Sequence, residues 1–146
     1  MVKVNFKKLD ERAVKPTYGS EFAAGADLYA CTGEPVSFAP GETKMVHTGL
    51  AVEIPEGYAG LVYARSGIAT KRGLAPANKV GVIDSDYRGE VMVSLHNHSS
   101  ETQEIAAGER IAQLVITPFL KAEYTEVAEL SETVRGGGGF GSTGKK

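Results

Sequence analysis

The sequence contains a single cysteine, Cys31, so no intramolecular disulfide can form. Its three histidines and that cysteine do not cluster at metal-ligand spacing, which excludes a structural zinc site of the usual Cys/His type. A chain of 146 residues does not depend on such links, because it can bury about two-thirds of its unfolded surface in one core. These absences favour a single domain in a reducing compartment.

A long apolar run is also missing. Residues 1–15 alternate charged and apolar side chains and lack the apolar core of a signal peptide or membrane anchor. With 16 Lys and Arg against 18 Asp and Glu, the net charge of -2 argues against electrostatic capture of nucleic acid. We therefore expect a cytoplasmic protein with no membrane and no nucleic-acid partner.

Short strand-sized runs separated by Gly and Pro make up most of the chain. This spacing predicts an all-β sandwich or barrel, and excludes a parallel α/β sheet. Residues 63–73 predict a strand that runs into the one helix, with Ser66 near its N-cap and Gly73 as its stop. Besides the runs that flank residues 84–90, the predicted strands are 2–7, 26–29, 36–38, 43–47, 50–54, 60–64, 104–106 and 110–117.

The stretch GVIDSDYRGEV, residues 81–91, is the richest in reactive side chains. Apolar alternation before and after it predicts a β-hairpin whose tip carries Asp84, Asp86, Tyr87 and Arg88. Such a tip can offer backbone N–H and C=O groups to a flat ligand. It can also be an exposed turn that uses Asp and Gly only for turn geometry.

Three other stretches carry candidate residues, each with a plainer structural explanation. Asp27, one residue into a strand, can face a metal-bound water or close an Asx turn. Arg65, Ser66 and Gly67 can bind phosphate at a helix N-terminus or form an ordinary helix start. Gln113, in an apolar strand that begins with Arg110, needs a hydrogen-bond partner, which the core or a ligand can supply.

The glycine-rich C-terminus, residues 135–146, formally matches G-x-G-x-x-G, but that motif needs a strand before it and a helix after it. By composition it is a disordered tail. Its aromatic ring, hydroxyls and free amides also suit a flexible arm that closes over a base and a phosphate chain.

Taken in order, the chain contains AGADL (24–28), RSGIA (65–69), GVIDSDYRGE (81–90), GERIAQ (108–113) and RGGGGFGSTG (135–144). In order and spacing these stretches resemble the five motifs of the homotrimeric dUTPase family, and they span nearly the whole chain. The resemblance implies a distorted jelly-roll β-barrel with one short helix, assembled as a threefold trimer. It also implies two parts, a folded domain over residues 1–134 and an arm over residues 135–146 that another subunit donates.

The implied activity is Mg²⁺-assisted hydrolysis of dUTP to dUMP and pyrophosphate, which limits uracil incorporation into DNA and supplies dUMP for dTMP synthesis. Asp84 matches the carboxylate that activates water for in-line attack on the α-phosphorus. Asp27 matches a residue that touches the metal through water. The implied substrate contacts are Asn78, Val82, Ile83, Tyr87 and Met92 for uracil and sugar, Arg65, Ser66, Gly67 and Gln113 for phosphates, and Arg135, Phe140, Gly141, Ser142 and Thr143 in the arm, where Phe140 stacks on uracil.

Two other interpretations are open. A dCTP deaminase shares the fold and an Arg-x-Ser-like motif, but residues 87–89 and the full glycine arm favour a dUTPase. A jelly-roll interaction module could bind RNA with its RGGGGFG tail, since Arg, Gly and Phe recur in such segments. The single copy of that tail and the acidic net charge argue against RNA binding.

Overall fold

A computed structural model describes residues 1–140 of the chain. Every strand pair within these residues is antiparallel, which confirms the predicted all-β class. The described elements are β1 (Asn5–Lys8), β2 (Thr17–Tyr18), β3 (Ala26–Tyr29), β4 (Val36–Phe38), β5 (Thr43–Glu53), β6 (Tyr58–Tyr63), α1 (Ser66–Arg72), β7 (Leu74–Pro76), β8 (Gly81–Ile83), β9 (Glu90–Asn97), β10 (Gln103–Ile105) and β11 (Arg110–Pro118).

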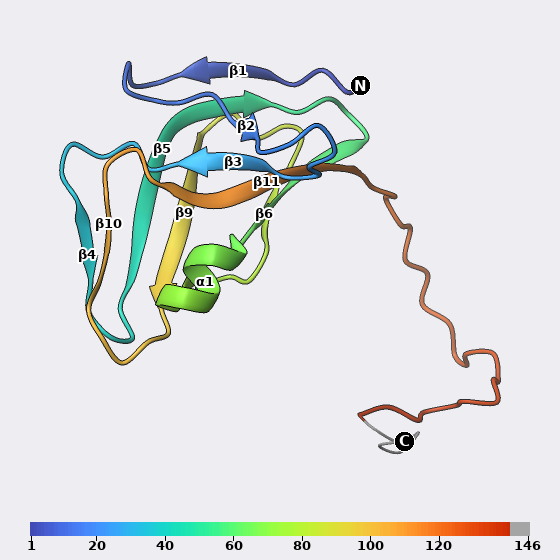
Figure 1. Ribbon diagram of the computed structural model, residues 1–146. Helices are drawn as coiled ribbons and strands as arrows, with labels where there is room; N and C mark the ends of the chain where they lie inside the picture. Colours follow the sequence, from blue (N-terminus) through green and yellow to red (C-terminus); the bar gives the residue numbers. More distant parts are fainter. Residues whose placement is uncertain (141–146) are drawn as a thin grey trace.

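The strands form two facing sheets, with a small strand pair at one end (Figure 1). One sheet has the order β2-β3-β11-β6-β8 and the other has the order β1-β5-β9-β7, while β10 pairs with β4. Strands that follow one another in the chain therefore often belong to opposite sheets. This arrangement is the distorted jelly roll that the family resemblance implies.

Alternating side chains of the facing sheets make the core. In β9, Val91, Val93 and Leu95 are buried, and they share one hydrophobic cluster with Leu28 and Ile111 of the opposite sheet. Period-two burial of this kind is what an antiparallel strand with one covered face requires. The other face of β9 is then free to line a surface cleft.

The two strands predicted at residues 43–47 and 50–54 are in fact one strand, β5. Its pairing with β9 shifts register between His47 and Ala51, which is a β-bulge. Gly49 lies inside the bulge with φ 67°, and its N–H donates to Glu90 Oε1 at 2.8 Å. The glycine does not end the strand, because a side chain of the neighbouring strand replaces the lost backbone partner.

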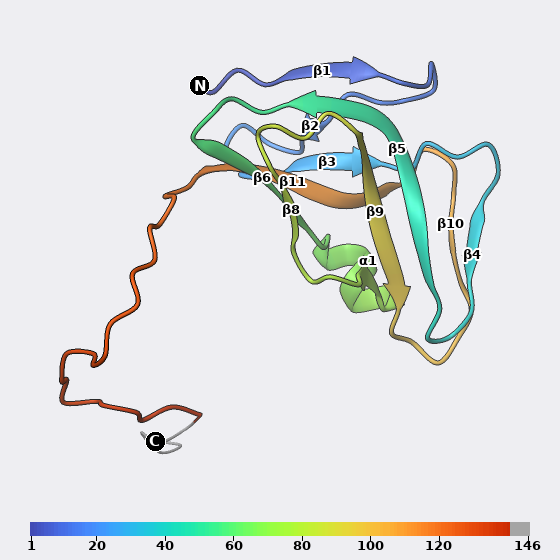
Figure 2. The same ribbon diagram turned by 180° about the vertical axis from the view of Figure 1, so that it is seen from behind.

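The predicted hairpin around residues 84–89 is wrong as a paired structure. β8 pairs with β6, whereas β9 pairs with β5 and β7, so the two strands belong to different sheets (Figure 2). The residues between them cross from one sheet to the other. Alternation alone predicted both strands correctly but could not show that their partners lie elsewhere.

Helix α1 is the only helix in the described part of the chain. Its N-cap is Arg65, with φ -90° and ψ 129°, so Ser66 is the first helical residue and lies next to the N-cap, as predicted. Gly73 ends the helix as predicted, in the left-handed conformation, and its N–H donates to Ala69 O at 3.1 Å. The short strands β2 and β7 were not predicted.

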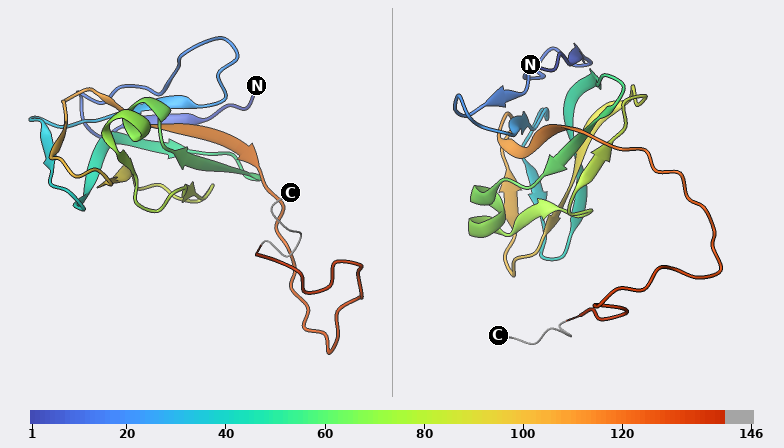
Figure 3. Two further views of the ribbon diagram at one scale, coloured as in Figure 1. Left: turned by 60° about the horizontal axis from the view of Figure 1, so that its bottom comes forward. Right: turned by 90° about the vertical axis from the view of Figure 1, so that its right-hand side faces the viewer.

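Beyond β11 the chain leaves the sandwich (Figure 3). From Phe119 to Phe140 it contains no helix or strand, and large apolar side chains such as Leu120, Tyr124 and Leu130 are almost fully exposed. Across residues 1–140, no helix has the length and apolar character needed to cross a membrane.

We predict that Gly49→Ala lowers the free energy of unfolding by about 2 kcal/mol or more. A Cβ at this position would lie 2.8 Å from Cys31 Sγ and 2.9 Å from Ala13 Cβ, in addition to the strain of a positive φ. Urea unfolding at one fixed protein concentration measures the loss. Gly57→Ala is the matched control, because Gly57 has φ 83° but no atom within 4 Å of its Cβ position. Equal losses in both variants would show that the bulge is not tightly packed.

Candidate active site

Strand register brings the first group of predicted residues together. On β3, Asp27 lies opposite Gln113 of β11, and Gln113 lies opposite Tyr63 of β6, two residues before Arg65. Three stretches far apart in the chain therefore meet on neighbouring strands. We call Asp27, Arg65, Arg110 and Gln113 the Asp27 cluster.

The Asp27 carboxylate holds two arginines. Its Oδ1 accepts from Arg65 Nε at 2.7 Å, and its Oδ2 accepts from Arg110 Nη1 at 3.2 Å. The Asp27 side chain is only 12% exposed. Such a carboxylate is stable because charge-assisted hydrogen bonds offset its desolvation. Arg65 binds Asp27 through Nε and contacts Arg110 O through Nη1, so Nη2 is the nitrogen of its guanidinium that remains available to a further anion in the described chain.

Gln113 fixes the chain just before Arg65. Its Nε2 donates to Ala64 O at 2.9 Å, so its partner is a backbone carbonyl at the β6–α1 junction. Gly25 makes room for this amide, because a Cβ there would lie 2.4 Å from Gln113 Oε1. The partner that the sequence required for Gln113 is thus present within the chain, and the amide is placed next to the arginine.

Ser66 and Gly67 lie at the surface beside this cluster. Both residues are exposed, and no atom lies within 4 Å of a Cβ built on Gly67. No side-chain hydrogen bond caps the helix at Arg65. Backbone N–H groups in the first turn of a helix have no intrahelical acceptor, so an anion can approach them here without displacing a protein group.

A second group of predicted residues surrounds a cleft of about 230 Å³ between β8 and β9. We call it the β8–β9 cleft. It exists because the two strands separate into different sheets, and β8 is the last strand of its sheet in the described chain. The predicted residues that line it are Asn78, Val82, Ile83, Asp84, Tyr87 and Met92.

Hydrogen bonds hold the turn that carries Asp84 and Tyr87. The Tyr87 N–H donates to Asp84 O at 3.1 Å, and Tyr87 Oη donates to Glu90 O at 2.9 Å. The ring folds back over Gly89, where a Cβ would lie 2.4 Å from Tyr87 Oη. Tyr87 is 42% exposed, so part of the residue is accessible to a ligand.

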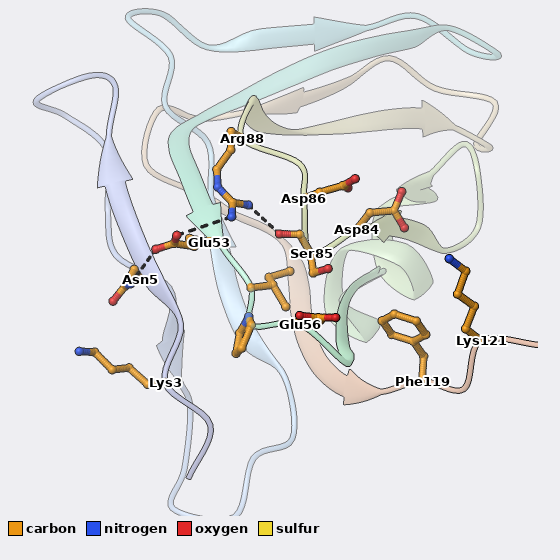
Figure 4. A pocket seen from close by; sticks show the side chains of 12 residues that line it. Lys3, Asn5, Glu53, Glu56, Asp84, Ser85, Asp86, Arg88, Phe119 and Lys121 are labelled. Atoms are coloured by element: carbon orange, nitrogen blue, oxygen red, sulfur yellow. Dashed lines mark hydrogen bonds and ion pairs between the residues drawn. The ribbon is translucent and has the colours of Figure 1, made fainter.

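Asp84 itself is exposed and lines two clefts. Besides the β8–β9 cleft, it borders a wider one of about 800 Å³ that includes Lys121 (Figure 4). Arg88 turns the other way, to Ser85 O at 2.6 Å and Glu53 Oε1 at 3.5 Å. No ion pair joins Asp84 to a cation within residues 1–140, so its carboxylate is free to accept a proton or a hydrogen bond.

The structure does not bring the two groups into one cleft. None of Asp27, Arg65, Ser66, Gly67 and Gln113 lines the β8–β9 cleft in the described chain. The arm is also separate: Arg135 Nε donates to Gly138 O at 2.8 Å, and Phe140 is fully exposed. Gly141, Ser142 and Thr143 lie outside the described residues. In a single described chain the predicted residues therefore lie in three separate places: beside Asp27, around the β8–β9 cleft, and in the arm.

The side chains of the site are compatible with a metal ion that binds through water, as the following contacts show. Among residues 1–140, no three His, Cys, Asp or Glu side chains are grouped as metal ligands, and both Asp27 oxygens already accept from arginines. Mg²⁺ usually keeps several waters and binds through one or two carboxylates plus substrate phosphates. A water-mediated contact with Asp27 is compatible with this, and a cage of protein ligands is not.

Sequence reasoning missed several residues that shape the site. Pro76 and Ser94 line the β8–β9 cleft, and Arg110 shares Asp27 with Arg65. Arg110 stood out in the sequence as a long polar side chain at the start of an apolar strand, but its partner is 83 positions away. Pro76 gave no signal, because it reaches the cleft only through the pairing of β7 with β9.

Comparison with known proteins gives a consistent result. A sequence model of the dUTPase family matches residues 11–144. The deoxyuridine 5'-triphosphate nucleotidohydrolase of Nautilia profundicola is 53% identical over 144 residues, covering 99% of this chain and all of the relative. That of an Anaeromyxobacter species is 55% identical over 130 residues, covering 89% of this chain and 87% of the relative.

Solved structures agree with the sequence comparisons. A mutant dUTPase of Staphylococcus bacteriophage 80alpha with dUpNHpp has a TM-score of 0.88 at 31% identity, covering 97% of this chain and 98% of that one. A mutant dUTPase of phage phi11 of S. aureus, described with a coordinated structural Mg(II) ion, has a TM-score of 0.78 at 29% identity, covering 87% and 97%.

Proposed function

The chain belongs to the dUTPase family, and we propose on this basis that it hydrolyses dUTP to dUMP and pyrophosphate. In a cell this reaction limits uracil incorporation into DNA and supplies dUMP for dTMP synthesis, and the expected compartment is the cytoplasm. The relatives that share about half of its residues are named for this activity. Its substrate would be a uracil deoxynucleotide that carries three phosphates.

The observation that carries the proposal is the β8–β9 cleft with Asp84 on its border. Six predicted contact residues line this cleft. Uracil presents an acceptor, donor, acceptor edge, which the free edge of a strand such as β8 can match with its own N–H and C=O groups. The Tyr87 ring then packs on the deoxyribose. A ring in this position leaves no room for a 2′-hydroxyl, so the site would reject UTP.

Asp84 is proposed as the general base. Hydrolysis at the α-phosphorus needs a water in line with the leaving pyrophosphate and a group that takes its proton. The Asp84 carboxylate is exposed and makes no ion pair in the described chain, so it can hold a water and accept its proton. The O–P bond to the water forms as the bond to pyrophosphate breaks, and no covalent enzyme intermediate is needed.

The Asp27 cluster is proposed to bind the phosphates. Arg65 offers the N–H groups of Nη2, and Ser66 and Gly67 offer exposed groups beside it, while Gln113 holds the backbone in place. Mg²⁺, when bound, would neutralise triphosphate charge and polarise the phosphoryl oxygens. Asp27 is the residue that would hold this ion, through water, because arginines already bind both of its oxygens.

A threefold trimer is proposed because one chain leaves the site incomplete. The Asp27 cluster and the β8–β9 cleft are separate groups, and the segment after Pro118 exposes apolar side chains away from the sandwich (Figure 1). In a trimer, the arm over residues 135–146 would reach the site of another subunit. Phe140 would then stack on uracil, with Arg135, Gly141, Ser142 and Thr143 on the phosphates.

The dCTP deaminase alternative is not favoured. The family match is to dUTPases, and the named relatives are nucleotidohydrolases. RNA binding by the tail has no observation in its favour beyond composition.

We expect the purified protein to release pyrophosphate from dUTP, and EDTA to abolish most of this activity, because the triphosphate needs a divalent ion. A coupled pyrophosphate assay measures the rate. Ammonia release from dCTP is the parallel measurement, and we expect none. Ammonia production without pyrophosphate release would replace the proposal with the deaminase alternative.

Asp84→Asn should fold and bind dUTP almost normally but lose turnover by about 100-fold or more, because an amide cannot accept the proton of the water. Steady-state kinetics and calorimetric binding of dUpNHpp separate the two effects. Asp86→Asn is the matched control, since Asp86 lies in the same turn but does not line the β8–β9 cleft. Wild-type turnover in Asp84→Asn would remove this residue from the role of base.

A chain that ends at Val134 should keep its assembly and its melting temperature to within a few degrees, because the glycines of the arm bury almost nothing. It should lose most turnover, since the nucleotide is no longer covered and aligned. Sedimentation, thermal unfolding and the pyrophosphate assay test the three statements. Undiminished turnover would make residues 135–146 a tail without function.

Mixing the truncated chain with Asp84→Asn chains tests whether the arm acts between subunits. Mixed trimers should regain activity where an intact Asp84 meets the intact arm of a neighbour. Differently tagged chains must first show that subunits exchange. Exchange without recovery would mean that each arm serves its own subunit.

A further inference from the structure

The last residue of α1, Arg72, makes contacts that phosphate binding by Arg65 does not explain. Its Nη1 donates to Glu109 Oε1 and its Nη2 donates to Glu104 O. The Arg72 side chain is 29% exposed and that of Glu109 is 26% exposed. Lys71, the preceding residue, is exposed, and its side chain makes no ion pair in the described chain.

Glu109 belongs to the turn that begins β11. Its Oε2 accepts from the Ala106 N–H at 2.9 Å, and its backbone carbonyl accepts from the Ala30 N–H at 2.8 Å. The next residue is Arg110, whose guanidinium binds Asp27. The carboxylate that holds Arg72 is therefore attached directly to the strand residue that shares Asp27 with Arg65.

These contacts close a ring around α1. Arg65, the N-cap, binds Asp27, Asp27 binds Arg110, and Arg110 follows Glu109, which binds Arg72 at the other end of the same helix. A second contact runs from Arg65 Nη1 to Arg110 O at 3.4 Å. Both ends of the helix are thus tied to the same turn by charged groups.

We propose that the Arg72–Glu109 pair is a positioning pair, which holds α1 so that the Arg65 guanidinium stays directed at the triphosphate. This inference rests on the proposed function, since it assigns a role in dUTP binding. Neither residue need touch the substrate. The pair acts by fixing the helix to the β10–β11 turn.

The helix itself buries little. It is seven residues long, and Ile68 is its only buried residue. A helix this short has no stability of its own, so its orientation depends on tertiary contacts. At its C-terminal end, Gly73 O accepts from the His98 N–H at 2.8 Å, and the buried Leu74 of β7 follows at once, paired with Asn97 of β9. Loss of Arg72 would remove the side-chain tie between this end of α1 and the β10–β11 turn.

Arg72→Met tests the inference, because methionine keeps the apolar stem and removes the charge and the donors. We expect its affinity for dUpNHpp, measured by calorimetry, to fall by about 5-fold, the effect of a partly exposed charge-assisted pair. Affinity for deoxyuridine, which has no phosphate, should not change. Lys71→Met removes the same charge from the same helix end, and we expect wild-type affinity for both probes. Equal losses in the two variants, or a loss shared by deoxyuridine, would overturn the inference.

Glu109→Gln distinguishes the positioning of α1 from a long-range electrostatic effect on triphosphate binding. Removal of a negative charge near the site should strengthen triphosphate binding if only long-range electrostatics matter. The positioning role predicts the opposite sign, a loss of dUpNHpp affinity similar to that of Arg72→Met, and little further loss in the double variant. Tighter binding by Glu109→Gln would overturn the inference. If the wild-type protein itself fails to bind dUpNHpp, the proposed function fails instead.

Discussion

The site depends first on one carboxylate, that of Asp27, which is held between two guanidinium groups. Without this charge, Arg65 and Arg110 would repel each other, and neither would have a fixed direction. With it, three neighbouring strands are joined at the level where α1 begins. The desolvation of Asp27 is offset by charge-assisted hydrogen bonds. The same bonds use Nε of Arg65 and leave Nη2 without a protein partner in the described chain.

The second constraint is the separation of β8 from β9. A hairpin would have consumed the backbone groups of both strands in pairing with each other. Because each strand pairs in a different sheet, the space between them is a cleft with a free strand edge and the Tyr87 ring on its border. The bulge in β5 supports this arrangement, since Glu90 binds Gly49 through its carboxylate and Tyr87 through its carbonyl. Packing in the core and the shape of the cleft are therefore linked through Glu90.

One described chain presents the two groups of residues and the start of the arm as separate surfaces. The chain after Pro118 exposes Leu120, Tyr124 and Leu130, side chains that a globular protein normally covers. The helix that carries Arg65 is held at both ends by ion pairs and at its middle by Ile68. Rigid strands and a tied helix thus place the charges of the Asp27 cluster.

Local sequence determined much of this protein. Gly73 ends the helix because a left-handed residue is needed there, and the alternation of Val91, Val93 and Leu95 is visible in any strand with one buried face. The motifs around Asp27, Arg65, Asp84 and Gln113 pointed to the family for the same reason, since each is a short stretch of adjacent residues.

Only the tertiary structure decided which strands pair and which charges meet. The hairpin prediction failed because β8 and β9 choose partners that lie far away in the chain, and two predicted strands became β5 because Glu90 satisfies the bulge at Gly49. The Arg110 partner is 83 positions distant, and no spacing in the sequence encodes it. Side-chain alternation specifies which face of a strand is buried, but the partner of that face depends on the free energy of packing the whole chain.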